Sequence, residues 1–156
     1  MGVELSDGEL YRKHADDLTR FATGLVGPAD AADVVSEAVL GWLASPRWAL
    51  VRDKRAYLYR AVYYEATSFH RTSNRRRSRE ERTASRDRVD VPDVRPEVLA
   101  AVSRLSVQQR AVIVLTYWDD LDPPAIAALL GISDGAVRRH LARARSRLKE
   151  ILDADT

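Results

Sequence analysis

Apolar residues recur at intervals of three and four over most of this 156-residue chain, but the pattern disappears between Thr72 and Pro96. Such spacing places side chains on one face of an α-helix, and the alternation typical of strands is scarce. The interrupted stretch is dominated by Arg, Ser and Asp, and it contains Pro92 as well as Pro96. We therefore predict an all-α protein with two small helical domains, residues 1–80 and 97–156, joined by a flexible linker over residues 81–96.

The net charge of +2 conceals three regions of different charge. Residues 1–53 carry 5 basic and 9 acidic side chains, residues 54–95 carry 12 and 6, and residues 96–156 carry 8 of each. Six of the last eight bases lie between Arg138 and Lys149, where there is no acidic residue. This distribution predicts different partners for different surfaces, although composition alone leaves solvated faces as an equal alternative.

Residues that build active sites and metal centres are absent or scattered. The chain has no cysteine, which excludes disulfides and thiolate metal sites, and it has no glycine-rich phosphate-binding loop. The acidic pairs Asp16-Asp17 and Asp119-Asp120 are adjacent, so on a helix their side chains would point about 100° apart. The three histidines fall in separate predicted helices: His14, His70 and His140. We expect no enzymatic activity, no metal and no cofactor.

The N-terminal stretch MGVELSDGELYRKHADD contains no apolar run that could form a signal peptide or a membrane span. No membrane insertion is therefore expected, and a cytoplasmic location is the default.

Three helices are predicted before residue 72. Ser6 and Glu9 have the spacing of a capping box at the start of the first. Gly27-Pro28 is predicted to end that helix and to start the second, with the proline in its first turn. Ser45-Pro46 ends the second helix, and the third runs from about Lys54 to beyond Arg71.

The segment DPPAIAALLGISDGAVRRHLARARSRLKEIL, residues 122–152, has the spacing of a helix-turn-helix. The small Ala127 lets two helices approach, and Gly131, four residues later, permits the left-handed backbone of a tight turn. Val137, six residues further on, anchors the second helix, which Ser133 is placed to cap. Asp119, Asp120 and Asp122 precede this unit at a helix junction, where capping and solvation explain them better than a metal does.

The second helix of this unit divides into an apolar and a basic face. With Val137 at the centre, the residues within about 40° are all apolar: Leu141, Ala144, Leu148 and Ile151. The residues that fall outside are Gly135, Arg138, Arg139, Ala142, Arg143 and Ser146. Small residues between arginines let a helix enter the major groove, where guanidinium groups reach guanine edges or phosphates. The alternative is a helical hairpin with a solvated basic back, but the turn spacing and the basic face together favour a DNA-reading unit.

The stretch LSVQQRAVIVLTYWDDLDPPAIAALLGISDGAVRRHLARARSRLKEIL resembles sigma domain 4 of the extracytoplasmic-function RNA polymerase sigma factors. The earlier stretches LYRKHADDLTRFATGLVGPADAADVVSEAVLGWL and KRAYLYRAVYYEATSFHRTSNRRR look like their sigma domain 2. A helix-turn-helix alone is unspecific, and its pairing with ADAADVVSEAVL is the specific part. The resemblance implies a transcription initiation factor that binds core RNA polymerase and directs it to promoter DNA.

The resemblance also implies where the partners bind. The acidic second helix would dock on the clamp helices of the polymerase beta-prime subunit, through Asp33, Ser36, Glu37 and Leu40. The second domain would sit on the beta-subunit flap while its last helix reads the minus-35 element. The residues predicted to face that duplex are Ser133, Gly135, Arg138, Arg139, Ala142 and Arg143. An anti-sigma protein is a further partner that is common in the family.

The third helix carries aromatic and basic side chains opposite its apolar stripe, which is centred on Val62. Bases stack on rings while cations hold the backbone, so this side suits single-stranded DNA. In the family, this helix and the loop before it, Ser45–Asp53 here, recognise and melt the minus-10 element. The minus-10 surface is therefore predicted to comprise Arg47, Trp48, Arg52, Tyr57, Arg60, Tyr64, Thr67 and Arg71. Packing against another helix or a regulator is the alternative for the tyrosines.

Four positions depart from the usual pattern of the family. Tyr57 stands where relatives usually have tryptophan, Tyr64 where they have asparagine, and Ser68 where they have aspartate. Gly41 stands where a larger, often basic residue is usual. The resemblance places Tyr64 and Ser68 on the melting and minus-10 surface, so it leaves open which promoters this chain chooses and how strongly it melts them.

Three alternatives to an initiation factor follow from the same residues. The first is a stand-alone helix-turn-helix regulator that binds duplex DNA without polymerase. The second is an enzyme acting on nucleic acid, for which the sequence offers little. The third is a sigma-like binding protein that has lost melting activity.

Overall fold

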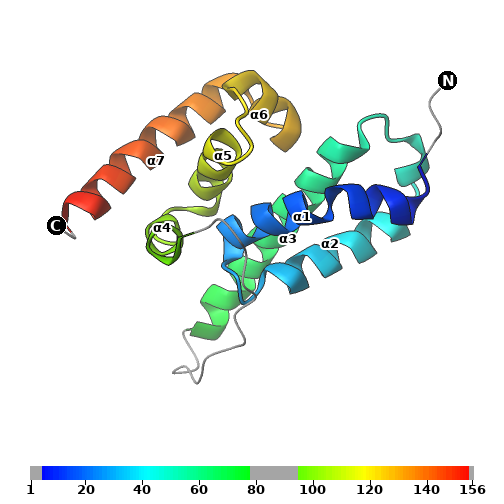
Figure 1. Cartoon of the computed structure of the whole chain (residues 1–156), viewed down its shortest axis with the longest axis horizontal. Helices are drawn as coiled ribbons and strands as arrows, with labels where there is room; N and C mark the ends of the chain where they lie inside the picture. Colours follow the sequence, from blue (N-terminus) through cyan, green and yellow to red (C-terminus); the bar gives the residue numbers. More distant parts are fainter. Residues whose placement is uncertain (1–4, 78–94, 155–156) are drawn as a thin grey trace.

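The structure is a computed structural model that describes residues 5–77 and 95–154, and every regular element in these two ranges is helical (Figure 1). The predicted linker over residues 81–96 lies almost entirely outside the described residues. Among the described helices, none is long and apolar enough to cross a membrane.

The first part of the chain, called the front module here, contains three helices that pack on one another: α1 (Asp7–Val26), α2 (Ala31–Ala44) and α3 (Lys54–Arg77). The predicted capping box of α1 is confirmed, since the Ser6 hydroxyl accepts from the Glu9 amide at 3.3 Å and the Glu9 carboxylate accepts from the Ser6 amide at 3.1 Å. Gly27 ends α1 with a positive φ of 89°. The prediction that Pro28 opens α2 is wrong, because Pro28 lies in the turn and α2 begins at Ala31.

The front module is held by large side chains that are fully withdrawn from water. Phe21 of α1 and Tyr59 of α3 pack with their ring centroids 5.2 Å apart. Trp42 of α2 is also among the large side chains that are fully buried. The predicted stripe of α3 is buried at Leu58, Val62 and Ala66 and half-buried at Phe69. Burial of these apolar surfaces is the main force that fixes the outward side of α3.

The second part, called the rear module, contains α4 (Pro96–Val102), α5 (Val107–Tyr117), α6 (Pro123–Leu130) and α7 (Asp134–Ala154). A capping box formed by Ser106 and Gln109 opens α5, and the Asp122 carboxylate caps α6 by accepting from the Ala125 amide at 3.0 Å. Gly131 adopts the left-handed conformation, with φ 71°, in the turn between α6 and α7. The helix-turn-helix geometry predicted from the residue spacing is therefore present.

The two modules are packed against each other rather than separated. Helix α5 lies between α7 of its own module and α1 of the front module, and α6 contacts α3 (Figure 1). Five consecutive residues of α5, Ala111–Leu115, are buried, which on a helix means burial on every side. Residues of both modules consequently form one continuous apolar core.

Candidate functional site

The outward face of α2 is acidic at its start and apolar at its end. Asp33, Ser36 and Glu37 are exposed, and Leu40, one turn further on, has 62% of its surface exposed. The opposite face is buried through Val34, Val35, Ala38 and Trp42. The four residues predicted to bind polymerase therefore share one solvent-facing side of a helix that the core holds in place.

Two further leucines are exposed shortly after Leu40 in the sequence, and sequence reasoning missed them. Leu43 on α2 is half exposed, and Leu50, in the short turn of 3-10 helix η1 (Trp48–Leu50), is 81% exposed. Leu40 and Leu43, three residues apart on α2, form an exposed apolar pair of the kind found at protein-binding surfaces. The interval of three from Leu40 to Leu43 was the available signal, because residues at i and i+3 lie on the same side of a helix.

The loop between α2 and α3 is built around Trp48, which is only 7% exposed. Its ring packs on Trp42 at 4.2 Å and on Tyr57 at 5.5 Å, and its indole nitrogen donates to the Asp7 carboxylate at 2.9 Å. Lys54 Nζ lies 5.0 Å from the centre of the same ring. Trp48 is a packing residue in this structure, and stacking of its ring on a base would require the loop to rearrange.

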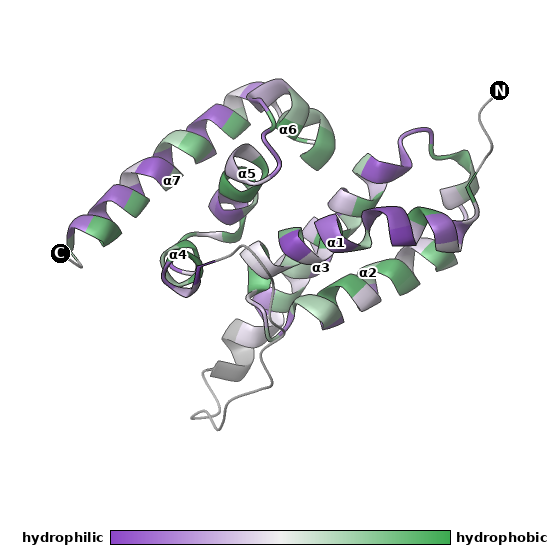
Figure 2. Ribbon diagram, viewed as in Figure 1, coloured by the Kyte–Doolittle hydropathy of each residue, from purple (hydrophilic) through white to green (hydrophobic). Residues whose placement is uncertain are grey.

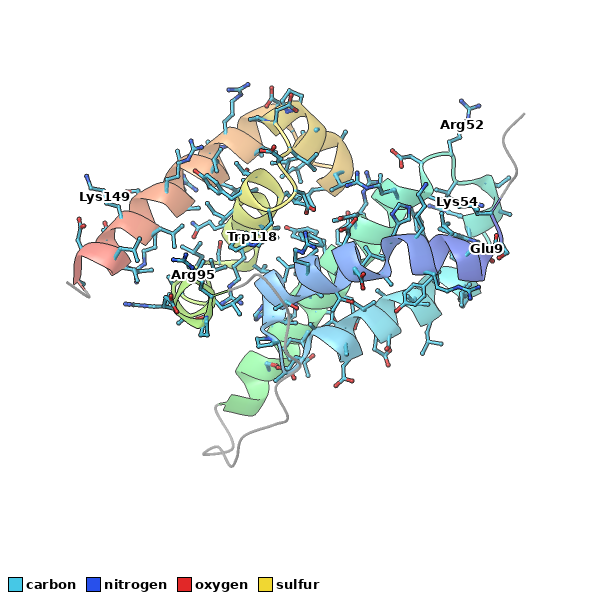
Figure 3. All side chains as sticks on the ribbon, in the orientation of Figure 1. Glu9, Arg52, Lys54, Arg95, Trp118 and Lys149 are labelled. Carbon is cyan, nitrogen blue, oxygen red and sulfur yellow. The ribbon has the colours of Figure 1, made fainter. Side chains whose placement is uncertain are left out.

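The two arginines of this loop differ from Trp48 in being exposed. Arg47 follows the bend at Pro46, and Arg52 points away from the ribbon at the end of the loop (Figure 3). The Trp48 cluster therefore fixes the loop, while Arg47 and Arg52 remain available to a ligand.

The outward side of α3 is only partly accessible. Tyr64 is 58% exposed and Arg71 is exposed, whereas Tyr57, Arg60 and Thr67 are half-buried. Each of the three has a protein partner: Tyr57 packs on Trp48, and the Thr67 hydroxyl donates to the Tyr63 carbonyl at 2.9 Å. Arg60 Nη2 donates to the carbonyl of Ala128 in α6 at 3.0 Å.

Burial changes the acidity of the tyrosines beside that surface. Withdrawal from water raises the pKa of Tyr59 and of Tyr63 above the ordinary phenol value, because the charged form is poorly solvated there. The ring of Tyr63 lies 5.8 Å from that of Tyr64. Both buried phenols therefore stay neutral at physiological pH and add no negative charge beside the arginines of α3.

The outward side of α7 is fully accessible, as the wheel of its residues predicted. Val137, Leu141, Ala144 and Ile151 are buried, Leu148 is half-buried, and Gly135, Arg138, Arg139, Ala142 and Arg143 are exposed. Hydrophilic and hydrophobic residues accordingly alternate along α7 (Figure 2). Ser133 caps the helix by accepting from the Ala136 amide at 3.1 Å.

Charge on α7 is supplied by arginine. Arg138 pairs with Asp134 at 3.2 Å, but both side chains are solvent-exposed, so the pair is weak and can be exchanged for another anion. Burial, followed by repulsion from Arg143 and Arg139, lowers the pKa of His140. The histidine is therefore neutral at physiological pH and adds hydrogen-bonding capacity rather than charge.

The acids at the α5–α6 junction do not assemble into a metal site. Asp122 is a helix cap, Asp120 adopts a positive φ of 57°, and Asp119 is half-buried. In the described part of the chain, no group of three or more His, Cys, Asp or Glu side chains could hold a metal ion.

Comparison with known proteins identifies both modules. Residues 10–76 match the family described as Sigma-70 region 2, and residues 95–148 match Sigma-70, region 4. The RNA polymerase sigma-E factor of Streptomyces antibioticus is 32% identical over 97% of this chain and 87% of its own length. The RNA polymerase sigma factor CnrH of Cupriavidus metallidurans is 28% identical over 99% of this chain and 91% of its own length.

Two solved structures have the same fold. The sigma factor RpoE of Bartonella quintana, in complex with the anti-sigma factor NepR, superposes with a TM-score of 0.68 and 23% identity over 96% of this chain and 98% of its own. CnrH in complex with the cytosolic domain of CnrY gives 0.64 and 25% identity over 96% and 88%. The match over almost the whole length, together with the acidic α2 and the arginine-faced helix-turn-helix, shows that this chain belongs to the RNA polymerase sigma factors of the sigma-70 family, in its extracytoplasmic-function group.

Proposed function

We propose that this transcription initiation factor, which directs RNA polymerase to promoters, divides its contacts among α2, α3 and α7. The observation that carries the assignment is that Asp33, Ser36, Glu37 and Leu40 form one exposed, acidic-to-apolar side of α2. Such a side suits docking on a basic and apolar protein surface, because complementary charge steers the approach and buried leucine adds affinity. The partner is the pair of clamp helices of the beta-prime subunit.

The rear module is proposed to bind the beta flap and to read the minus-35 duplex through α7. Arg139 and Arg143 are exposed on the outer side of the helix, and Gly135 and Ala142 beside them add no bulk. This combination allows the helix to lie deep in a major groove while its guanidinium groups reach base edges and phosphates.

The minus-10 element is proposed to be bound as a single strand by the outward side of α3 and the preceding loop. Tyr64 supplies an exposed ring, and Arg47, Arg52 and Arg71 supply exposed cations. Stacking on an aromatic ring is worth roughly 1–3 kcal/mol per base, which offsets much of the cost of extruding one. With tyrosine at position 64, stacking replaces part of the hydrogen bonding that an amide would supply.

The protein is further proposed to be a binding factor without enzymatic activity of its own, and to work in the cytoplasm, where polymerase and promoter DNA are. Two solved relatives are bound to proteins, one to the anti-sigma factor NepR and one to the cytosolic domain of CnrY. We infer a regulatory protein of the same kind for this chain, with the exposed leucines Leu40, Leu43 and Leu50 as part of its binding surface.

Run-off transcription with core polymerase on genomic fragments tests the proposed function, and Glu37→Lys tests the α2 assignment. The charge reversal should weaken the affinity for core polymerase about tenfold or more, since like charges facing each other cost several kcal/mol. Asp16→Lys, at an exposed acid of α1, is the matched control and should bind as the parent does. An unchanged pull-down of Glu37→Lys would place the clamp contact elsewhere.

A stand-alone regulator would behave differently in the same assays. It would bind duplex DNA at nanomolar concentration by itself, would not bind core polymerase, and would give no run-off product.

A further inference from the structure

An acidic residue stands at the start of the otherwise basic part of α7. Asp134 is the first residue of this helix, and the next acid along it is Glu150. The six Arg and Lys side chains of the helix all lie between these two acids. An exposed carboxylate on a helix that approaches DNA is repelled by the phosphates, so Asp134 is expected to weaken DNA binding unless it has a positioning role.

The start of α7 is fixed by its cap, and Asp134 directly follows the capping residue. The Ser133 hydroxyl accepts from the Ala136 amide at 3.1 Å. One turn later, Arg138 Nε donates to Asp134 Oδ1 at 3.2 Å, with 63% of the arginine side chain and 48% of the aspartate side chain exposed. Exposed ion pairs four residues apart add little to the stability of a protein, so stability does not account for this one.

The atom of Arg138 that Asp134 binds decides which of its donors remain available. The carboxylate binds Nε, and neither Nη group of Arg138 makes a hydrogen bond to the described part of the chain. Two Nη groups in one plane match the N7 and O6 acceptors on the major-groove edge of guanine. Asp134 therefore holds one side of the guanidinium group and leaves the side that fits guanine open.

The carboxylate also changes which acceptor Arg138 favours. A guanidinium group alone is attracted to the charge of a phosphate, but the pair with Asp134 has no net charge, and the carboxylate repels a phosphate nearby. The edge of guanine carries no net charge, so it can accept from the two Nη groups without that repulsion. Within a groove, where water is displaced, the bond between the two side chains is stronger than in bulk water.

We propose that Asp134 is a specificity-determining residue, which holds Arg138 by Nε so that its Nη groups read a guanine instead of binding a phosphate. The proposal rests on the proposed function of α7 as the reader of the minus-35 duplex. Asp134 acts through Arg138 and is a positioning residue. It lowers the affinity of the helix for DNA in general and raises its preference for one base pair.

A second ion pair on the same helix provides a matched control. Arg147 Nη1 and Glu150 Oε2 lie 3.2 Å apart, and the two side chains are 47% and 66% exposed. Arg147 is nine residues beyond Arg138, which is roughly 14 Å further along the helix, whereas the residues that meet base edges are at the start of a recognition helix. The two pairs are thus alike in exposure and different in their expected distance from the bases.

The test is a selection of duplexes by the holoenzyme formed from the full chain and core polymerase. The probe is a promoter obtained by run-off transcription and randomised over its upstream duplex. The base pair read by Arg138 is the upstream position whose G·C preference is lost in Arg138→Ala. At that position Asp134→Ala should reduce the preference about tenfold, the loss expected when a guanine contact is no longer fixed. Glu150→Ala should leave every preference as it is in the parent.

Salt dependence supplies a second readout, on a duplex that contains no promoter. In Asp134→Ala the released Arg138 gains a phosphate contact, so non-specific affinity should rise, and the slope of log affinity against log salt should steepen by about 0.9. The double variant Asp134→Ala/Arg138→Ala should show neither the gain nor the steeper slope. Both results require Asp134 to act through Arg138.

A purely structural role for Asp134 gives different results. If the carboxylate only stabilised the start of α7, Asp134→Ala would weaken binding to all sequences equally and would leave the salt slope unchanged. That result, or a base preference that survives in Asp134→Ala or in Arg138→Ala, would overturn the proposal. A parent chain that formed no holoenzyme, or a holoenzyme that selected no upstream sequence, would instead reject the proposed function, and this inference with it.

Discussion

Helices α3 and α7 are both long, basic and proposed to meet DNA, yet the protein treats them differently. On α7 the outward arginines face water, and the ion pair that Arg138 forms with Asp134 is itself exposed. On α3 the outward side is divided, because Tyr64 and Arg71 are exposed while Arg60 is bound by α6. The outward side of α7 is thus accessible in this arrangement of the helices, whereas part of the outward side of α3 is covered by α6.

The largest expected effect is on the accessible helix. Arg139→Ala should reduce promoter-specific transcription about 10- to 100-fold, because loss of an arginine contact to a base costs about 1–3 kcal/mol. Affinity for core polymerase should be unchanged in a pull-down. Arg147→Ala is the control, since Arg147 is exposed nearer the end of α7 and pairs with Glu150 at 3.2 Å. If Arg139→Ala also lost affinity for core polymerase, α7 would be a polymerase contact and not a duplex contact, and the contrast with α3 would not hold.

A smaller effect is expected at the exposed ring of α3. Tyr64→Ala should slow opening of duplex promoters up to about tenfold, and it should have less effect on promoters that are already melted, because the ring stabilises the separated strand. Permanganate reactivity of the exposed thymines measures the opening. Tyr64→Phe keeps the stacking ring and should behave as the parent does. Equal defects on duplex and pre-melted templates would show that Tyr64 acts through packing and not through melting.

The smallest expected effect is a pH dependence of the module contact. Burial raises the pKa of Asp119 above its ordinary value of 3.8; Asp17 of α1 adds to the rise, and Arg55 of α3 and Arg20 of α1 oppose it. An acid whose pKa is raised in the packed state binds its proton more tightly there, so packing is favoured at low pH and weakens as the pH rises through the raised value. Small-angle X-ray scattering should therefore give a slightly smaller radius of gyration in mild acid than at neutral pH. Asp119→Asn should abolish the difference, and an undiminished difference would assign it to another group.

Features governed by neighbours in the sequence could be predicted. The caps of α1, α5 and α6, the left-handed Gly131 and the two faces of α7 all follow from residue type and spacing over a few positions. The same is true of the exposed side of α2, because its carboxylates stand opposite a clear apolar stripe.

Features that depend on contacts between distant residues could not be predicted. Trp48 was expected to face DNA, but its partners Asp7 and Trp42 come from other helices, and no local pattern connects them. The bond from Arg60 to Ala128 spans 68 positions, so a helical wheel of α3 places it correctly on the outward side without showing what covers it. One signal was available for the module contact: the run Ala111–Leu115 is apolar throughout, which on a helix indicates neighbours on every side.

The hydrogen bond from Trp48 to Asp7 has a consequence for how the loop meets its ligand. A loop that is loose before binding loses conformational entropy when it is ordered, at roughly 0.5–1.5 kcal/mol for each long side chain that is immobilised. Here the first turn of α1 fixes the loop backbone in advance through a buried indole, and only the ends of Arg47 and Arg52 remain to be ordered. The loop that is proposed to contact the promoter strand is thus held in place by a residue 41 positions away in the sequence.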